Sequence, residues 1–152
     1  MSAEYRRDEF LISTDPAKLD LDVIHGFLTR AYWLEGVSRA VVEQALRHAL
    51  CFGLYAGPQQ IGLARVITDY ATFAYVADVF VLAEYRGRGL GKWLMRTVRA
   101  HPDLQGLRRW SLATKDAHGL YRQVGFGELR NPDRWMEIVD LDTYTRATPR
   151  EG

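Results

Sequence analysis

The sequence predicts a mixed α/β domain of the α+β class, in which a mostly antiparallel central sheet is flanked by helices. Three apolar, β-branched runs follow one another between residues 51 and 82, separated by short turn-forming segments. A segment with helical spacing then precedes another strand-like run, residues 109–113. A strand–helix–strand unit of this kind places its two strands parallel. We therefore expect one central parallel strand pair, flanked by antiparallel hairpins.

The N-terminal half is expected to contain a strand and two helices before the first hairpin. Residues 9–13 form a short strand-like run, and apolar side chains recur at helical spacing over residues 21–32. Ser38 is expected to cap the second helix, because a serine hydroxyl accepts a hydrogen bond from a free N–H of the first turn. Strands over residues 51–55 and 61–68 follow, and a Gly-Pro turn joins them as a hairpin.

The C-terminal half is expected to contain the central strand, two helices and three further strands. The strand covers residues 73–82, and the next helix ends before Pro102, since proline disfavours a helical residue in front of it. After the strand at 109–113, Asp116 is expected to cap a helix that ends at Gly125 in the left-handed conformation. Residues 126–129 and 135–139 are expected to form a closing β pair, and the tail from residue 145 is polar and expected to fray.

Length and composition indicate one domain over residues 1–152, with its core at about residues 9–140. The 152 residues are 47% hydrophobic and 26% charged, which is ordinary for a globular protein. No apolar run approaches the about 20 residues that a membrane span needs, and the N-terminus lacks the apolar core of a signal peptide. The single cysteine, Cys51, lies in an apolar strand-like run, which favours core packing over nucleophilic chemistry. We expect a cytoplasmic protein without a metal site, because the four histidines lack metal-ligand spacing.

A glycine-rich segment between the central strand and the next helix is the most informative part of the sequence. It holds three glycines in five residues, from Gly87 to Gly91. Free N–H groups and the helix dipole make such a helix start a site for anions, and therefore for phosphate. A Walker A loop would need Ser or Thr at Trp93, and a dinucleotide-binding loop would need Gly at Lys92. Neither nucleotide pattern fits.

Basic residues are concentrated after this segment, although the net charge of the chain is only +1. Seven Lys or Arg and one acid lie between residues 86 and 109. Such a field attracts phosphate groups, and Arg88 and Lys92, which lie at the loop, are the candidates for this role. Arg96 and Arg99 are expected on the solvated face of the helix. The low net charge gives no indication of nucleic-acid or membrane binding.

Two segments resemble the motifs of the GNAT superfamily of N-acetyltransferases. Arg86-Gly87-Arg88-Gly89-Leu90-Gly91 is similar to the coenzyme A loop of the family, Arg/Gln-x-x-Gly-x-Gly/Ala. Residues 117–126 resemble its Ala-x-x-Leu-Tyr-x-x-x-Gly-Phe helix, at the expected distance. The element order also matches, so the resemblance covers roughly residues 9–140. It implies an enzyme that transfers an acetyl group from acetyl-CoA to an amine by direct attack.

The resemblance implies a donor site built mainly from backbone. The pantetheine arm would lie along the end of the central strand, where one amide would stabilise the thioester oxygen. Thr114 stands where the family often carries an asparagine that bonds this arm, and its hydroxyl can still donate and accept. The implied donor-binding residues are Val79, Phe80, Val81, Arg86, Gly87, Arg88, Gly89, Leu90, Gly91, Lys92, Thr114 and Ala117.

Tyr121 is the expected catalytic acid, because it matches the tyrosine of the family helix and a phenol can protonate a departing thiolate. Without that match, a tyrosine on an amphipathic helix would indicate core packing. Asp78 interrupts an apolar strand and is either the general base or a hydrogen-bonded structural carboxylate. Ordered water could take the proton instead. Glu84 is expected to face solvent.

The acceptor pocket is expected near Tyr32, Trp33 and Tyr70, because aromatic rings beside acids suit a cationic amine. The same rings could simply pack a helix on the sheet. A small-molecule amine is favoured over a protein lysine or N-terminus, since nothing suggests an arm for a protein substrate. The alternatives are a non-catalytic acyl-CoA sensor and a structural interaction domain. A homodimer through the C-terminal strands is plausible.

Overall fold

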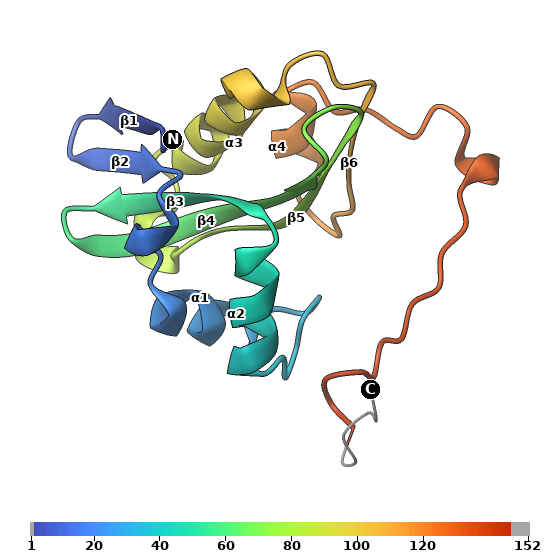
Figure 1. Ribbon diagram of the computed structural model, residues 1–152, viewed down its shortest axis with the longest axis horizontal. Coiled ribbons are helices and arrows are strands. Elements are labelled where there is room, and N and C mark those ends of the chain that lie inside the picture. The colour runs from blue at the N-terminus through green and yellow to red at the C-terminus, as the bar shows by residue number, and fades with distance from the viewer. Residues whose placement is uncertain (1, 147–152) are drawn as a thin grey trace.

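The computed structural model describes residues 2–146, in which six strands form one sheet with helices on both faces (Figure 1). The strands lie in chain order: β1 (Glu4–Arg7), β2 (Phe10–Ser13), β3 (Leu50–Ala56), β4 (Gln59–Thr68), β5 (Phe73–Val81) and β6 (Arg109–Leu112). The α-helices are α1 (Leu21–Leu28), α2 (Arg39–Arg47), α3 (Leu90–Ala100) and α4 (His118–Arg122). The predicted mixed α+β sheet is confirmed.

All strand pairs are antiparallel except β5–β6, which is parallel. Helix α3 connects these two strands, so the prediction of a parallel pair from the strand–helix–strand unit is confirmed. Strand β6 is the last in the sheet order. The parallel pair consequently lies at one end of the six-stranded sheet.

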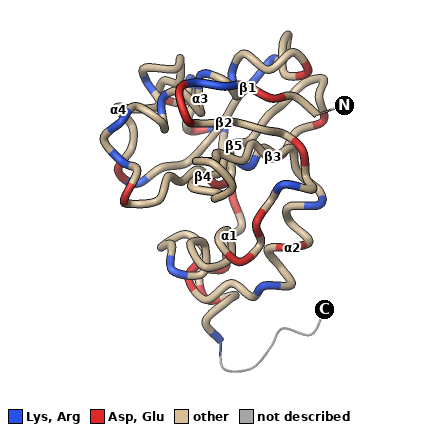
Figure 2. Tube along the Cα trace, turned by 90° about the vertical axis from the view of Figure 1, so that its left-hand side faces the viewer, with Lys and Arg blue, Asp and Glu red and all other residues tan. Residues whose placement is uncertain are grey.

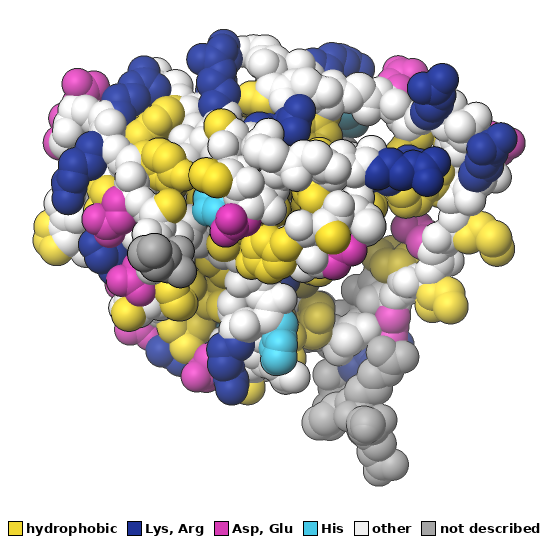
Figure 3. Space-filling view, turned by 45° about the horizontal axis from the view of Figure 1, so that its top comes forward, with side chains coloured by type: hydrophobic (Ala, Val, Ile, Leu, Met, Phe, Trp, Pro, Cys, Tyr) yellow, Lys and Arg dark blue, Asp and Glu magenta, His cyan; other side chains and the backbone are white. Residues whose placement is uncertain are grey.

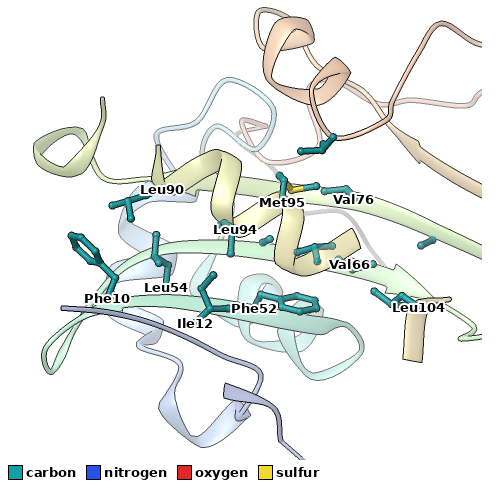
Figure 4. Close-up of a cluster of buried hydrophobic side chains, with 14 of the residues drawn as sticks. Phe10, Ile12, Phe52, Leu54, Val66, Val76, Leu90, Leu94, Met95 and Leu104 are labelled. Carbon is teal, nitrogen blue, oxygen red and sulfur yellow. The ribbon is translucent and has the colours of Figure 1, made fainter. Parts of the chain in front are cut away.

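The two sheet faces bury separate hydrophobic clusters. On one face, Leu90, Leu94 and Met95 of α3 pack on side chains of β2, β3, β4 and β5 (Figure 4). On the other face, α1 and α2 cover Leu63 and Phe80. Amphipathic helices therefore pack their apolar sides against both faces of the sheet.

Side-chain caps fix where the N-terminal helices start. The Asp20 carboxylate accepts from the N–H of Val23 at the start of α1. The Ser38 hydroxyl accepts from the N–H of Val41, 3.3 Å away, which confirms the predicted cap of α2.

The structure corrects several predicted boundaries. Strand β1 was not predicted, because its sequence is polar; it forms by pairing with β2 at the edge of the sheet. Helix α1 ends at Leu28 instead of residue 32. The prediction of Asp116 as a cap is wrong: α4 begins after Ala117, whose N–H donates to the hydroxyl of Thr114. Helix α4 ends at Arg122, earlier than predicted, and Gly125 has the expected positive φ of +102° in the turn that follows.

The predicted closing β pair is not present. Residues 126–129 and 135–139 belong to no strand of the described chain, and a 3₁₀ turn at Pro132–Arg134 leads the segment away from the sheet (Figure 1). Part of the predicted tail, residues 147–152, lies outside the described residues.

The predicted surroundings of Cys51 are confirmed, whereas those of Arg99 are wrong. Cys51 is buried in the cluster beneath α1 and α2, as predicted, and burial raises the pKa of its thiol to about 12. Arg99 is not on a solvated face. Its Nε donates to the carbonyl oxygen of Val124 at 3.1 Å, and its guanidinium lies 4.9 Å from the ring centroid of Trp110.

No helix within residues 2–146 has the length and apolar character needed to cross a membrane.

Candidate active site

Strands β5 and β6 run side by side for four residues and then separate. Their pairing joins Phe73–Val76 to Arg109–Leu112, whereas β5 continues to Val81 on its other partner, β4. A β-bulge at Ala77 accompanies the separation, and a bulge bends the strand that carries it. Beyond the bulge, the edge of β5 that faces β6 has no strand partner in the described chain. An extended ligand can add to such an edge through backbone hydrogen bonds.

The free edge of β5 leads to the glycine-rich start of α3. The first hydrogen bond of this helix runs from the N–H of Trp93 to the carbonyl of Gly89, so the preceding N–H groups have no acceptor within the helix. Gly87 and Gly89 have φ angles of +81° and +74°, which glycine adopts without steric cost. A Cβ atom at either position would meet nothing within 4 Å. The loop is open to a ligand.

Positive charge surrounds this loop, and the first turn of α3 contains no acidic residue. Arg86 and Arg88 are exposed, and Lys92 is half-buried on the first turn. The Arg86 Nε donates to the carbonyl of Val81 at 3.0 Å, which fixes the loop against the end of β5. Figure 2 shows Lys and Arg around α3 and α4. The exposed Glu84 agrees with the prediction that it faces solvent.

Tyr121 lies on α4, on the β6 side of the split. Its ring packs edge-on against Phe126, with centroids 5.9 Å apart. Burial, together with smaller effects of the nearby Tyr32 and Asp116, raises the pKa of Tyr121 to about 12. The phenol is therefore protonated near neutral pH and available as a hydrogen-bond donor.

The loop after α1 reaches across to the segment that precedes α4. The N–H of Lys115 donates to the Tyr32 hydroxyl at 3.0 Å, and the Lys115 ammonium lies 5.4 Å from the centre of the Tyr32 ring. Trp33 packs edge-on against Tyr32, with centroids 5.0 Å apart. Two aromatic side chains from the N-terminal half thus lie beside the Tyr121 helix.

Asp78 is 2% exposed, and both of its oxygens have partners. The indole Nε1 of Trp33 donates to Oδ1 at 2.7 Å, and Nε of Arg65 donates to Oδ2 at 2.5 Å. Arg65 is also largely buried, so this is an interior ion pair between β4 and β5. A cavity of about 50 Å³ borders Arg65 and Asp78 beneath α2. The carboxylate orients Trp33 and compensates the charge of Arg65.

Tyr70 is not brought together with Tyr32 and Trp33. It lies in the turn before β5, at the opposite end of that strand from the split, where burial and Asp103 raise its pKa. The Asp69 side chain is bound within the same turn by N–H groups of residues 71–73 and by the Thr72 hydroxyl. These bonds hold the pKa of Asp69 well below its usual range. This turn organises the β4–β5 hairpin.

Sequence reasoning missed two residues of this region. Lys115 was not singled out, although its backbone N–H anchors Tyr32. Arg65 was not recognised as the charge partner of Asp78. An acid and a base in adjacent apolar strands were the available signal, because such buried charges are usually paired.

The split sheet, the glycine-rich start of α3 and the tyrosine of α4 together define the acetyltransferase class of mixed α/β domains. Residues 47–128 match the family model for the acetyltransferase (GNAT) domain. FG08082 of Gibberella zeae, which is classed as an acetyltransferase, is 35% identical over an alignment that covers 85% of each chain. This chain belongs to the GNAT family of acetyltransferases.

Solved structures show the same fold. A GNAT-family protein of Xanthomonas campestris pv. campestris is 50% identical, with a TM-score of 0.88 over 90% of this chain and 97% of that one. A GNAT acetyltransferase of Elizabethkingia anophelis, solved with acetyl-CoA bound, has a TM-score of 0.63 at 16% identity. It covers 88% of this chain and 90% of that one, and at this identity the likeness is one of fold.

Proposed function

We propose that this protein is an N-acetyltransferase that moves an acetyl group from acetyl-CoA to a small-molecule amine. The observation that carries the proposal is the split between β5 and β6, which leads from an unpaired strand edge directly to the glycine-rich start of α3. Tyr121 lies on the far side of the split.

The donor would be held mainly by main-chain groups. The pyrophosphate is assigned to the N–H groups of residues 87–92, with Arg86, Arg88 and Lys92 supplying positive charge. The pantetheine arm is assigned to the free edge of Val79, Phe80 and Val81, and Thr114 and Ala117 lie on the opposite side. The open space at Gly87 and Gly89 supports this assignment. The fold shared with the acetyl-CoA complex from Elizabethkingia anophelis supports it as well.

The reaction is a direct attack on the thioester. The amine nitrogen bonds to the carbonyl carbon, the carbon–sulfur bond breaks, and the thiolate takes a proton from the Tyr121 hydroxyl. The amine loses its proton to water, and the phenolate recovers one from solvent. Burial raises the pKa of Tyr121, and the same desolvation would raise that of a thiol beside it, which keeps the proton transfer feasible.

Asp78 is assigned a positioning role instead of that of general base. Its two oxygens are occupied by Arg65 and Trp33, and its side chain is almost completely buried. It would act by holding Trp33 at the acceptor side of the split. Water is then the proton acceptor for the amine.

The acceptor pocket is assigned to the space near Tyr32 and Trp33. Both rings are substantially exposed while anchored by hydrogen bonds, so they present fixed aromatic surfaces. Such surfaces bind a cationic amine through cation–π attraction.

The second candidate function is an acyl-CoA sensor without turnover. The location of Tyr121 beside the split favours the enzyme. Tyr121→Phe separates the two, because removal of a general acid lowers turnover by about 10²- to 10⁴-fold. The enzyme would lose turnover but keep its affinity for acetyl-CoA, whereas a sensor has no turnover to lose and would keep its affinity.

The first experiment is calorimetry with acetyl-CoA, using coenzyme A and ATP as comparison ligands. We expect micromolar binding of acetyl-CoA and its loss in Gly89→Asp. Aspartate tolerates the left-handed conformation of Gly89 better than most residues, so this variant should stay folded. A folded wild-type protein without affinity for acetyl-CoA would refute the transferase proposal and favour an interaction domain.

A further inference from the structure

Arg65 is a basic residue in the interior of the domain. Figure 3 shows Lys and Arg side chains standing out at the rim of one face of the molecule, where solvent reaches them. The Arg65 side chain is instead only 13% exposed, and it borders a cavity between the sheet and the helices α1 and α2. A charged side chain is unfavourable in the interior unless its polar atoms have partners. The partners of Arg65 therefore indicate what this residue does.

Asp78 occupies only part of the Arg65 guanidinium. Nε of Arg65 donates to Oδ2 of Asp78 at 2.5 Å, and neither Nη atom donates to any group within residues 2–146. Arginine has five N–H donors, so the four donors on Nη1 and Nη2 are left for another acceptor. They are not sealed from solvent, because the Tyr55 hydroxyl is the only fully buried side-chain nitrogen or oxygen of the described chain that lacks a partner. The outer side of the guanidinium is therefore available to a ligand.

The cavity beside the ion pair has the character of a small-molecule site. Its volume is about 50 Å³, and most of its walls are apolar side chains of α1, α2 and the loop between them, among them Leu28, Val37 and Val42. It reaches the surface at Val41, which is 40% exposed. One water molecule needs about 10 to 15 Å³ of such space, so the two oxygen atoms of a carboxylate fit. Apolar walls with a few converging polar groups are typical of ligand pockets.

Asp78 connects this cavity to the split between β5 and β6. Its Oδ1 accepts from the Trp33 indole at 2.7 Å, and Trp33 packs against Tyr32 on the acceptor side of the split. The next residue of β5 after Asp78 is Val79, where the free edge assigned to the donor begins. Arg65 is on the neighbouring strand, about 4.8 Å away. One small molecule can therefore contact both the aromatic rings and the Arg65 guanidinium.

The charges favour a ligand that carries both signs. Because Asp78 already compensates Arg65, a simple anion would add a net charge to the interior. A simple amine would leave the Nη donors without an acceptor. An amine that also carries a carboxylate has no net charge while the amine is protonated. Its carboxylate suits the guanidinium, and its ammonium suits the rings of Tyr32 and Trp33.

We propose that the acceptor of this enzyme is an amino acid, held by its carboxylate at Arg65 with its amine directed to the split. This proposal rests on the proposed acetyltransferase function and adds the class of the amine. Asp78 fixes the Nε side of the guanidinium, and the Nη side receives the substrate. Arg65 is thus a residue that determines specificity. The carboxylate takes no part in the bond changes, which remain those of the direct attack on the thioester.

Matched pairs of amines test this class directly. Each pair contains an amino acid and the amine that remains without its carboxyl group: L-phenylalanine and phenethylamine, γ-aminobutyrate and propylamine, L-lysine and cadaverine. Acetyl transfer from acetyl-CoA is followed by release of the thiol. We expect the amino acid of at least one pair to have a kcat/KM about 10- to 100-fold higher, the factor that hydrogen bonds to a charged group contribute. Equal values within all three pairs would overturn the proposal and leave the transferase function in place.

Binding separates this proposal from the transferase function. Calorimetry with the same six compounds, on protein saturated with coenzyme A, measures recognition without turnover. Selective binding of an amino acid without acetyl transfer would support the site at Arg65 and contradict the enzyme. If none of the three amino acids binds more tightly than its matched amine, the proposal is wrong even where acetyl-CoA itself binds.

Arg65→Lys removes the guanidinium but keeps a positive charge opposite Asp78. The kcat/KM of the preferred amino acid should fall about 10- to 100-fold, to the value of its matched amine, and the value for that amine should hardly change. Arg39→Lys is the matched control, because Arg39 also pairs with an aspartate, Asp22, but at the surface. An equal loss with both compounds would indicate a merely structural role for Arg65 and would overturn the proposal.

Filling the cavity tests the proposal without changing the ion pair. Ala45 lines the cavity on α2, and Ala45→Leu adds volume there with a residue that favours helices. The preference for the amino acid should be lost. Ala40→Leu on the same helix is the control, since Ala40 is exposed and is not among the cavity walls. Circular dichroism checks that both variants are folded. A preference that survives in folded Ala45→Leu would refute the site at Arg65.

Discussion

Burial sets the protonation of the one cysteine in the sequence. The thiol pKa of Cys51 is about 12 in the folded protein, whereas an unfolded cysteine titrates near pH 8.5. Between these values the unfolded chain loses the proton and the folded chain keeps it. The contribution of Cys51 to stability is therefore complete below about pH 8.5 and is lost progressively as the pH rises toward 12.

The measurement that checks this is urea denaturation at pH 8 and pH 9.5. The wild-type protein should lose about 1 kcal/mol more than Cys51→Ala over this interval, since one pH unit corresponds to about 1.36 kcal/mol per proton. If the stability of both proteins depended on pH in the same way, the buried thiol would not be the cause of the loss. The comparison is between the changes in unfolding free energy with pH, so the pH-independent loss of stability from the cavity left by alanine does not affect it.

At the scale of elements, the stability of the β4–β5 pair depends on the interior ion pair between Arg65 and Asp78. Arg65→Ala or Asp78→Ala each leaves a buried charge without its partner, which costs about 3 to 5 kcal/mol. The double variant removes both charges and should cost clearly less than the two single costs together. Urea denaturation of the four proteins checks this, and additive costs would mean that the two side chains do not interact.

The start of α3 contains two glycines with opposite expected responses to alanine. Gly89→Ala should destabilise the protein by about 1 to 2 kcal/mol, because its left-handed conformation is unfavourable for alanine. Gly91→Ala should be neutral or stabilising by up to about 1 kcal/mol, because it is helical and its Cβ would lie 3.8 Å from Leu120. Thermal melts of both variants test this difference, and equal destabilisation would count against it.

Short stretches of sequence predicted those parts of the molecule whose conformation depends mainly on neighbouring residues. The apolar run of β5, the glycines before α3 and the Ser38 cap each depend on neighbouring residues, and each was placed correctly. The parallel pair followed from the order of the elements.

Contacts between distant residues could not be read in this way. Trp33 and Asp78 are 45 positions apart, and nothing near either residue identifies the other as its partner. Arg99 has the spacing of a solvated helix face, yet Trp110 and the Val124 carbonyl attract it inward. Residues 135–139 were predicted to form a strand, yet they pair with no strand of the described chain. A strand has no stable conformation until a partner supplies the other half of its hydrogen bonds.

The separation of β5 from β6 has a consequence for how this protein can evolve. A ligand held by main-chain N–H and C=O groups is insensitive to most side-chain substitutions along the strand that binds it. The aromatic residues on the loop after α1 belong to a different element, so substitutions there leave the backbone edge of β5 in place. Under the proposed function, mutation could redirect the enzyme to new amines while its use of the donor is inherited unchanged.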